Sequence, residues 1–174
     1  MFLKRSLLVV ALCSAIVVPA RSAEQPSKAP CSTPEHRALD FWIGEWEVSD
    51  KAGKPAGRSS VERILDGCAI FENWTSIGNP YAGQSFNTFD PKEGRWTQYY
   101  VDSTGLVAQM TGAFAGKNLV YRREFKRADG RQVASRMTFF NLDGNQVRQL
   151  VEQSTDGGET WNTQYDLTYR RRAL

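Results

Sequence analysis

Hydrophobic and polar residues alternate with a period of two over much of the chain after Phe41, as is typical of strands that bury one face. The clearest case is segment 42–49, where Trp42, Gly44, Trp46 and Val48 share one face. We expect this tryptophan face to point inward. Segment 160–169 repeats the alternation. Its expected inner face consists of Trp161, Tyr165, Leu167 and Tyr169, opposed to Thr160, Asn162, Gln164, Asp166 and Thr168.

Turn-forming residues divide this region into about ten short strands. The turn signals fall at residues 51–53, 66–67, 79–80, 90–91, 103–105, 115–116, 129–130, 143–144 and 156–158. They recur roughly every 8 to 15 residues, which leaves no room for crossover helices, so the strands should run antiparallel in sequence order. Such a meander closes most easily into an all-β, up-and-down antiparallel barrel in which the first and last strands pair.

A short helix is expected before the first strand. Thr33 supplies a capping hydroxyl, Pro34 suits the first turn, and Glu35 lies near the positive end of the helix dipole. This helix should end near Asp40. His36, the only histidine of the chain, is interpreted as a residue of the helix surface.

The first 22 residues have the features of a cleavable secretory signal peptide. Lys4 and Arg5 precede an apolar run, and small residues at positions 20 and 22 favour cleavage after Ser22. The apolar run is too short to span a membrane, and Leu12 is too large for lipoprotein processing at Cys13. We therefore expect an exported protein, located in the periplasm.

The rest of the chain suits one domain. Residues 23–32 are rich in Pro, Ser, Lys and Ala and are expected to form a flexible leader. Residues 33–174 are expected to form a single barrel domain. No segment after the signal peptide is apolar enough to predict a transmembrane helix.

Removal of the signal peptide also removes the net charge. The chain has 22 basic and 19 acidic residues, and residues 1–22 contain three of the basic residues and none of the acidic ones. The mature chain is therefore formally neutral. Its one local basic cluster is Arg170, Arg171 and Arg172, which we interpret as the solvated end of the last strand. This balance argues against a nucleic-acid partner.

Two cysteines remain after cleavage, Cys31 and Cys68. An even number of cysteines in an oxidising compartment is what a structural disulfide requires, so we predict that the two pair. Their bridge would attach the N-terminal arm to the barrel. The alternative is a pair of buried thiols.

Three expected inner faces combine aromatic residues with a few polar ones. They contain Cys68, Ile70, Glu72 and Trp74; Trp96, Gln98, Tyr100 and Asp102; and Leu119, Tyr121, Arg123 and Phe125. Apolar walls with sparse polar groups are typical of small-molecule sites. The candidate ligand-binding residues are Trp42, Trp46, Glu72, Trp74, Gln98, Tyr100, Tyr121, Arg123 and Gln149. The alternative is that these faces are misassigned and that charges such as Glu72 and Arg123 lie in solvent.

Several segments of this sequence resemble a bacterial family of unknown function that is similar to nitrobindins. The matching segments are residues 39–48 (LDFWIGEWEV), 67–74 (GCAIFENW), 96–102 (WTQYYVD) and 148–158 (RQLVEQSTDGG). The resemblance covers residues 39–171. It implies a calycin-like barrel of about ten antiparallel strands, related in shape to lipocalins, and an exported protein. It implies no known activity.

The nitrobindins bind heme through a histidine late in the chain, and here the sequence departs from that pattern. The only histidine is His36, and no residue at the matching position can act as the ligand. Heme ligation by Tyr100 or Tyr121 is possible in principle, but a tyrosine of a barrel interior is usually part of the core. We therefore predict no heme and no other cofactor.

Three functions remain open. The leading hypothesis is an exported barrel that binds or carries a small, partly apolar molecule in its lumen. The second is a cofactor-independent lyase, isomerase or hydrolase that uses Glu72 and Asp102 as acid and base, provided that both face one lumen. The third is an envelope interaction module with a fully packed barrel. The scarcity of histidine weighs against catalytic triads and zinc sites.

Overall fold

Ten antiparallel strands form a closed barrel in the computed structural model, which describes residues 29–172. The predicted signal peptide and most of the predicted leader lie outside the described residues. Each strand pairs with its neighbours in sequence, and β1 closes the ring by pairing with β10. The prediction of an up-and-down barrel with a short N-terminal helix is therefore confirmed.

The elements follow the predicted turns closely. The helical elements are α1 (Pro34–Arg37) and the 3-10 helices η1 (Asp40–Trp42) and η2 (Leu65–Gly67). The strands are β1 (Gly44–Asp50), β2 (Pro55–Ile64), β3 (Ala69–Ser76), β4 (Ala82–Asp90), β5 (Arg95–Asp102), β6 (Val107–Ala115), β7 (Asn118–Lys126), β8 (Gln132–Asp143), β9 (Gln146–Ser154) and β10 (Asn162–Arg171).

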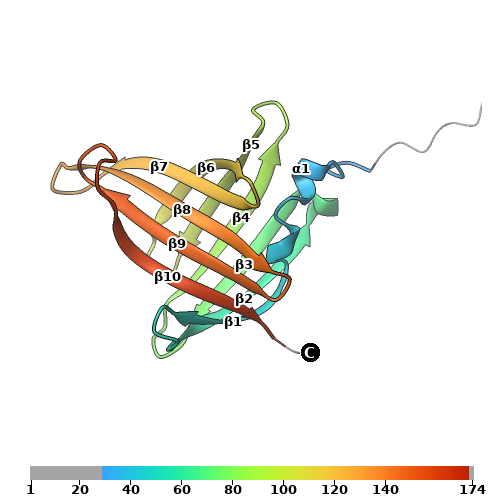
Figure 1. The fold of residues 1–174 in the computed structure, drawn as a ribbon, viewed down its shortest axis with the longest axis horizontal. Helices are drawn as coiled ribbons and strands as arrows, with labels where there is room; N and C mark the ends of the chain where they lie inside the picture. The colour runs from blue at the N-terminus through green and yellow to red at the C-terminus, as the bar shows by residue number, and fades with distance from the viewer. Residues whose placement is uncertain (1–28, 173–174) are drawn as a thin grey trace, which may run out of the picture.

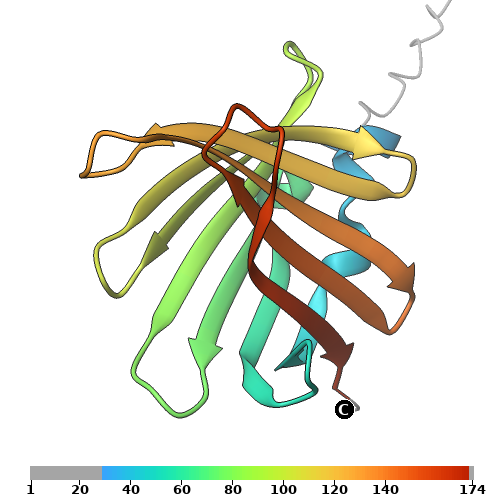
Figure 2. The same ribbon diagram turned by 60° about the vertical axis from the view of Figure 1, so that its left-hand side comes forward.

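The first and last strands meet along five residue pairs, among them Val48 opposite Tyr169. Both of these side chains are buried, so the alternation seen in the sequence continues across the closure. Figure 2 shows β10 descending beside β1 toward the C-terminal end of the chain.

The up-and-down topology gives the barrel two different ends. Helix α1, η1, η2 and the turns after β4, β6 and β8 lie at one end, which we call the closed end. The turns after β1, β3, β5, β7 and β9 lie at the other, the open end. In Figure 1, α1 is at the right and the turns after β7 and β9 are at the left.

Large apolar side chains fill the closed half of the lumen. Leu39, Trp42, Trp46, Leu119 and Phe139 have no measurable exposure. The rings of Trp42 and Phe139 lie 4.5 Å apart between centroids, and the indole Nε1 of Trp46 donates to the backbone oxygen of Trp42 at 2.8 Å. Because η1 places Trp42 across the end of the barrel, the packed side chains of Trp42 and Phe139 close that end. We call this pair the plug.

Two details of the N-terminal segment differ from the sequence-based expectations. Trp42 belongs to η1 and not to the first strand, which begins at Gly44. Thr33 is the N-cap of α1, but its hydroxyl makes no capping hydrogen bond. That hydroxyl instead lies 2.8 Å from Nδ1 of His36, so the imidazole takes the place of the backbone amide.

His36 is not a surface residue, and this prediction was wrong. Its side chain is 8% exposed and packs edge-to-face on Phe89, with ring centroids 5.2 Å apart. The helix contacts β4, the strand that carries Phe89, so the face that carries His36 is covered. A four-residue helix has too few turns for its buried side to be read from periodicity.

The beginning of β10 also differs from the expected alternation. Trp161 precedes the strand, and its ring stacks under the guanidinium of Arg136 at 4.1 Å. The pairing register with β9 shifts between Thr163 and Tyr165, which marks a β-bulge at Gln164. This bulge turns Gln164, which the alternation placed outside, toward the lumen.

The predicted disulfide between Cys31 and Cys68 is present. It joins the N-terminal arm to the residue that precedes β3, at the closed end. Nearby, the carboxylate of Asp40 accepts ion pairs from Arg37 at 3.0 Å and from Arg63 at 2.6 Å. Among the described residues, no helix is long and apolar enough to cross a membrane.

Candidate ligand-binding site in the barrel lumen

A cavity of about 400 Å³ occupies the open half of the lumen. This volume falls in the range of small-molecule sites, roughly 300 to 1,000 Å³. Its apolar lining consists of Trp74, Leu106, Ala108, Met110, Met137, Val151 and Leu167. The barrel is therefore packed at one end and hollow at the other.

Two glycines allow aromatic rings to lie flat against the wall of this cavity. An added Cβ at Gly57 would lie 2.5 Å from the indole of Trp74, and one at Gly83 would lie 2.6 Å from Cζ of Tyr100. Real Cβ atoms do not approach so closely, so only glycine fits beneath each ring. The two glycines therefore leave the space beside the wall that these rings occupy.

A polar layer forms the floor of the cavity, and Glu72 is its centre. Its Oε1 accepts hydrogen bonds from the hydroxyl of Ser59 at 2.9 Å and from Tyr169 at 3.3 Å. Its Oε2 accepts one from Ser85 at 3.1 Å. The side chain is 4% exposed and still lines the cavity. Glu72 therefore points inward, as the strand alternation predicts.

Amide side chains extend this layer in both directions. On one side, Asn87 donates to Ser85 at 3.1 Å and accepts from Gln98 at 3.1 Å and from Tyr121 at 3.0 Å. On the other side, Tyr169 donates to Oε1 of Gln149 at 2.9 Å. The layer thus crosses the lumen from β7 to β9 as one connected network.

Burial changes the protonation of Glu72. Removal from water raises the pKa of this carboxyl group from its ordinary value of 4.5 to about 7, against the opposing effect of the hydrogen bonds from Ser59, Ser85 and Tyr169. The carboxyl group is therefore largely neutral below pH 7. Among the described residues that line the cavity, it is the one carboxyl group.

Asp102, the suggested catalytic partner of Glu72, lies at the rim of the cavity, where its carboxylate is bound within the turn after β5. Its Oδ1 accepts hydrogen bonds from the hydroxyl and the amide of Thr104, at 2.6 and 2.8 Å, and from the amide of Leu106 at 3.2 Å. These bonds, led by the Thr104 hydroxyl, lower the pKa of Asp102. The carboxylate thus shapes the turn after β5, and no hydrogen bond joins it to Glu72.

Two tyrosines connect this turn to the cavity. The hydroxyls of Tyr81 and Tyr100 lie 2.5 Å apart, and Tyr81 also donates to Oδ2 of Asp102 at 3.1 Å. Burial raises the pKa of both phenols, so both stay protonated in neutral solution. Across residues 29–172, no three His, Cys, Asp or Glu side chains are grouped so that they could hold a metal ion.

Arg123 enters the cavity from β7. Its side chain is half-buried, and its guanidinium lies 4.5 Å from the ring centroid of Phe125. Burial lowers the pKa of Arg123, but an arginine remains charged at neutral pH. The alternative that Glu72 and Arg123 lie in solvent is therefore wrong for both residues.

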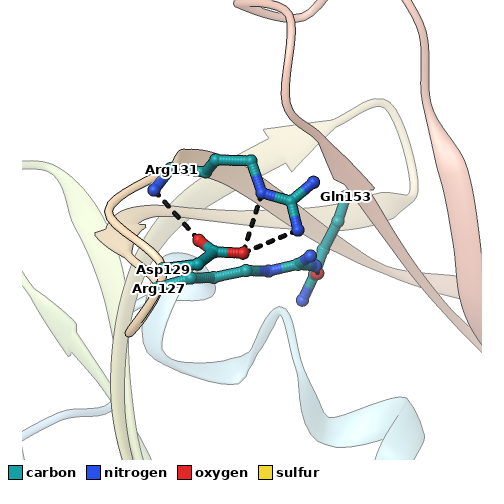
Figure 3. A network of polar contacts seen from close by, with 4 residues as sticks. All are labelled: Arg127, Asp129, Arg131 and Gln153. Atoms are coloured by element: carbon teal, nitrogen blue, oxygen red, sulfur yellow. Dashed lines mark hydrogen bonds and ion pairs between the residues drawn. The ribbon is translucent and has the colours of Figure 1, made fainter.

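Polar contacts hold the turn after β7 and link it to β9 (Figure 3). Arg127 donates to Oε1 of Gln153, a residue of the cavity lining, at 2.7 Å. Asp129 accepts from Nε and Nη2 of Arg131 at 2.9 and 2.6 Å. Both arginines of the turn after β7 are thus engaged by neighbours.

The structure divides the nine predicted site residues into two groups. Six line the cavity: Glu72, Trp74, Gln98, Tyr100, Arg123 and Gln149. Trp42, Trp46 and Tyr121 lie instead in the packed interior, without measurable exposure. The alternation predicts which side of the wall a residue faces, but not how far along the barrel axis it lies.

Several lining residues were not among the predicted site residues. Tyr165, Leu167 and Tyr169 share the expected inner face of the last strand, so a signal for them was present. Tyr81 precedes β4 and Leu106 precedes β6, so both lie in turns at the open end. Strand periodicity says nothing about such positions.

Comparison with solved structures shows a shared fold. An S-type phycobiliprotein lyase (CPES) from Guillardia theta matches with a TM-score of 0.53 and 10% identity, over 83% of this chain and 96% of the lyase. At this level of identity the likeness shows a shared fold and no more. A protein of unknown function from the DUF3598 family of Nostoc punctiforme matches with 9% identity over 80% of this chain and 100% of that one, but its TM-score of 0.23 supports no inference. No family model and no curated protein matches the sequence.

Proposed function

We propose that this is an exported barrel protein that binds or carries a small, partly apolar molecule in the open half of its lumen. The observation that carries the proposal is the cavity of about 400 Å³ above a fully hydrogen-bonded polar floor. Its walls are apolar at Trp74, Met110 and Met137, and a few polar groups converge on it. Apolar walls supply affinity, and sparse polar groups set orientation.

The fold comparison supports a small-molecule site without identifying the ligand. The similar barrel is named as a phycobiliprotein lyase, and at 10% identity the likeness extends to the fold only. We further propose that the domain is a relative of the nitrobindin-like barrels that takes no heme. In support of this, His36 packs on Phe89 at the closed end and does not line the cavity.

Export is part of the proposal. It is supported by the signal-peptide features of residues 1–22 and by the Cys31–Cys68 disulfide, a bond that persists in oxidising compartments. Mass spectrometry of the protein from the envelope fraction of its host should give a chain that begins at Ala23. A chain that retains residues 1–22 in the cytoplasm would contradict export.

The binding proposal can be tested with the uncharged fluorescent probe N-phenyl-1-naphthylamine, whose emission rises in apolar surroundings. We expect saturable binding to the wild-type protein. Ala108 on β6 lines the cavity, so Ala108→Phe should fill it and weaken binding by roughly tenfold or more. The matched control is Ala113→Phe on the same strand, at a groove beside α1.

The two variants distinguish the lumen from the groove. Loss of probe binding in Ala108→Phe, with wild-type affinity in Ala113→Phe, would support a lumenal site. The reverse pattern would move the site to the groove at the closed end. Circular dichroism must first show that Ala108→Phe is folded. If it is not, Ala108→Leu provides a smaller obstruction for the same titration.

A further inference from the structure

We propose that the ligand carries a carboxylate group and that Arg123 is its counter-ion in the lumen. This inference rests on the proposed function, because it assigns a chemical class to the molecule in that cavity. Four features of the described residues lead to it: the position of Arg123, its lack of an acidic partner, the engagement of the lumenal carboxyl group elsewhere, and the apolar walls around it.

Arg123 occupies a central position in the cavity wall. It lies on the inner face of β7, opposite Ser135 of β8, and both residues line the cavity. Among the described lining residues it is the only lysine or arginine. Its guanidinium packs over the ring of Phe125, 4.5 Å from the ring centroid. The charge is therefore fixed in direction before any ligand arrives.

Within residues 29–172, no carboxylate lies within ion-pair distance of Arg123, and its Nε is buried without a hydrogen-bond partner. The other arginines of the adjoining walls do have acidic partners. Arg136 pairs with Glu152 and Arg148 with Asp166, each at 2.7 Å. An unpaired, partly buried guanidinium is costly, and an anion from outside the chain would offset that cost.

Glu72 does not meet this need. Its two oxygens are already engaged in hydrogen bonds with Ser59, Ser85 and Tyr169, and burial raises the pKa of this carboxyl group to about 7. A neutral acid supplies no counter-charge. The lumen thus holds one fixed positive charge with no negative one to balance it below pH 7.

The geometry favours a carboxylate over larger anions. A guanidinium presents two parallel N–H groups that match the two oxygens of one carboxylate. A phosphate dianion would bring a second charge, for which the described lining offers no second cation. Beyond Arg123, the sulfur-containing side chains of Met110 and Met137 provide adaptable apolar surface for the rest of the molecule.

The test is displacement of N-phenyl-1-naphthylamine by decanoate and by decanol, which differ only in the head group. We expect decanoate to bind the wild-type protein about tenfold more tightly than decanol. In Arg123→Gln this preference should disappear while the uncharged probe still binds. Arg123→Lys, which keeps the charge but not the paired donors, should restore part of it. Arg122→Gln, at an exposed position of the same strand, should behave like the wild type.

The outcomes separate this inference from the proposed function. If the probe fails to bind the wild-type protein, the lumenal site itself is wrong. If the probe binds but decanoate and decanol compete equally, or if the preference survives in Arg123→Gln, the site stands and the assignment of a carboxylate is overturned. Probe binding by Arg123→Gln also shows that the variant retains its lumen, so loss of folding cannot imitate the expected result.

Discussion

At the scale of single residues, the hydrogen bonds of Tyr169 agree with a neutral Glu72. The phenol has one hydrogen, yet it faces two oxygens, Oε1 of Gln149 at 2.9 Å and Oε1 of Glu72 at 3.3 Å. If Glu72 is protonated, it can donate to the phenol oxygen while Tyr169 donates to Gln149. Both contacts are then satisfied. If Glu72 is ionised, one acceptor must go without its hydrogen.

The first prediction concerns the pH dependence of stability. The folded state holds a proton on Glu72 up to about pH 7, whereas the unfolded chain releases it near 4.5. Between these values the folded state binds more protons, so the free energy of unfolding should fall as pH rises. Once the pH is above 7, the total decrease in the free energy of unfolding should be about 3 kcal/mol. Glu72→Gln cannot ionise and should lack this fall, as measured by urea unfolding across the window.

The matched control is Glu47→Gln, which changes an exposed carboxylate on β1. It should keep the wild-type decline, because it leaves Glu72 and the residues around it unchanged. Parallel profiles for the wild type and Glu72→Gln would show that the carboxyl group is ionised in the fold. Glu72→Gln should also lose some stability at low pH, because an amide donates where a carboxyl oxygen accepted from Ser59 or Ser85.

At the scale of elements, the wall formed by β3, β4 and β5 determines the width of the cavity. Gly83 stands opposite Trp74 on one side and Asp102 on the other, with the ring of Tyr100 over it. A side chain at this position would push that ring away from the wall. The hydroxyl contact between Tyr81 and Tyr100 would then be lost.

The second prediction follows from this packing. Gly83→Ala should destabilise the protein by about 1 to 3 kcal/mol, the usual cost of overpacking. It should also weaken binding of the naphthylamine probe, because the displaced ring of Tyr100 enters the cavity. Gly144→Ala is the control, since a Cβ there meets nothing within 4 Å. Equal stability and affinity for both variants would mean that Tyr100 moves freely and does not define the wall.

The sequence predicts well which residues of this wall face inward, but it predicts poorly what happens where a strand begins, ends or bulges. The reason is physical. Strand faces follow from a strict period of two, so Glu72 and Tyr100 are correctly placed inside. The period fails where the backbone departs from a regular strand, as in η1 at Trp42 and at the bulge that turns Gln164 inward. How far along the barrel axis a residue lies depends on the shear of the sheet, which strand alternation does not reveal. Tyr121 therefore has the sequence pattern of a site residue, although it lies in the packed interior.

At the scale of the whole molecule, the polar floor separates two halves with different tasks. The closed half carries the plug of Trp42 and Phe139 and stabilises the fold. The open half lacks that packing and holds the cavity. Gln153, one of the lining residues, accepts a hydrogen bond from Arg127. Substitutions in the plug should therefore act on stability first, and substitutions above Glu72 should act on binding first.

The third prediction applies this division to the disulfide. The Cys31–Cys68 bridge lies at the closed end and closes a loop of 37 residues. In the chain-entropy description, its loss widens the unfolded ensemble and costs about 4 kcal/mol. The double variant Cys31→Ser, Cys68→Ser should thus unfold at lower urea concentration, and reduction of the wild-type protein should reproduce the shift. Probe affinity should not change, because neither cysteine lines the cavity.

Probe affinity and the free energy of unfolding must be measured on the same preparation. Together they show whether the bridge stabilises the fold alone or also shapes the lumen. A large loss of stability with unchanged affinity is expected, since η1 remains held by Trp42 and by the ion pairs of Asp40 with Arg37 and Arg63. If affinity falls as well, the bridge also shapes the lumen, and the two halves are coupled across the polar floor. A stability loss below about 1 kcal/mol would contradict the entropic account, because a loop of this length should contribute more.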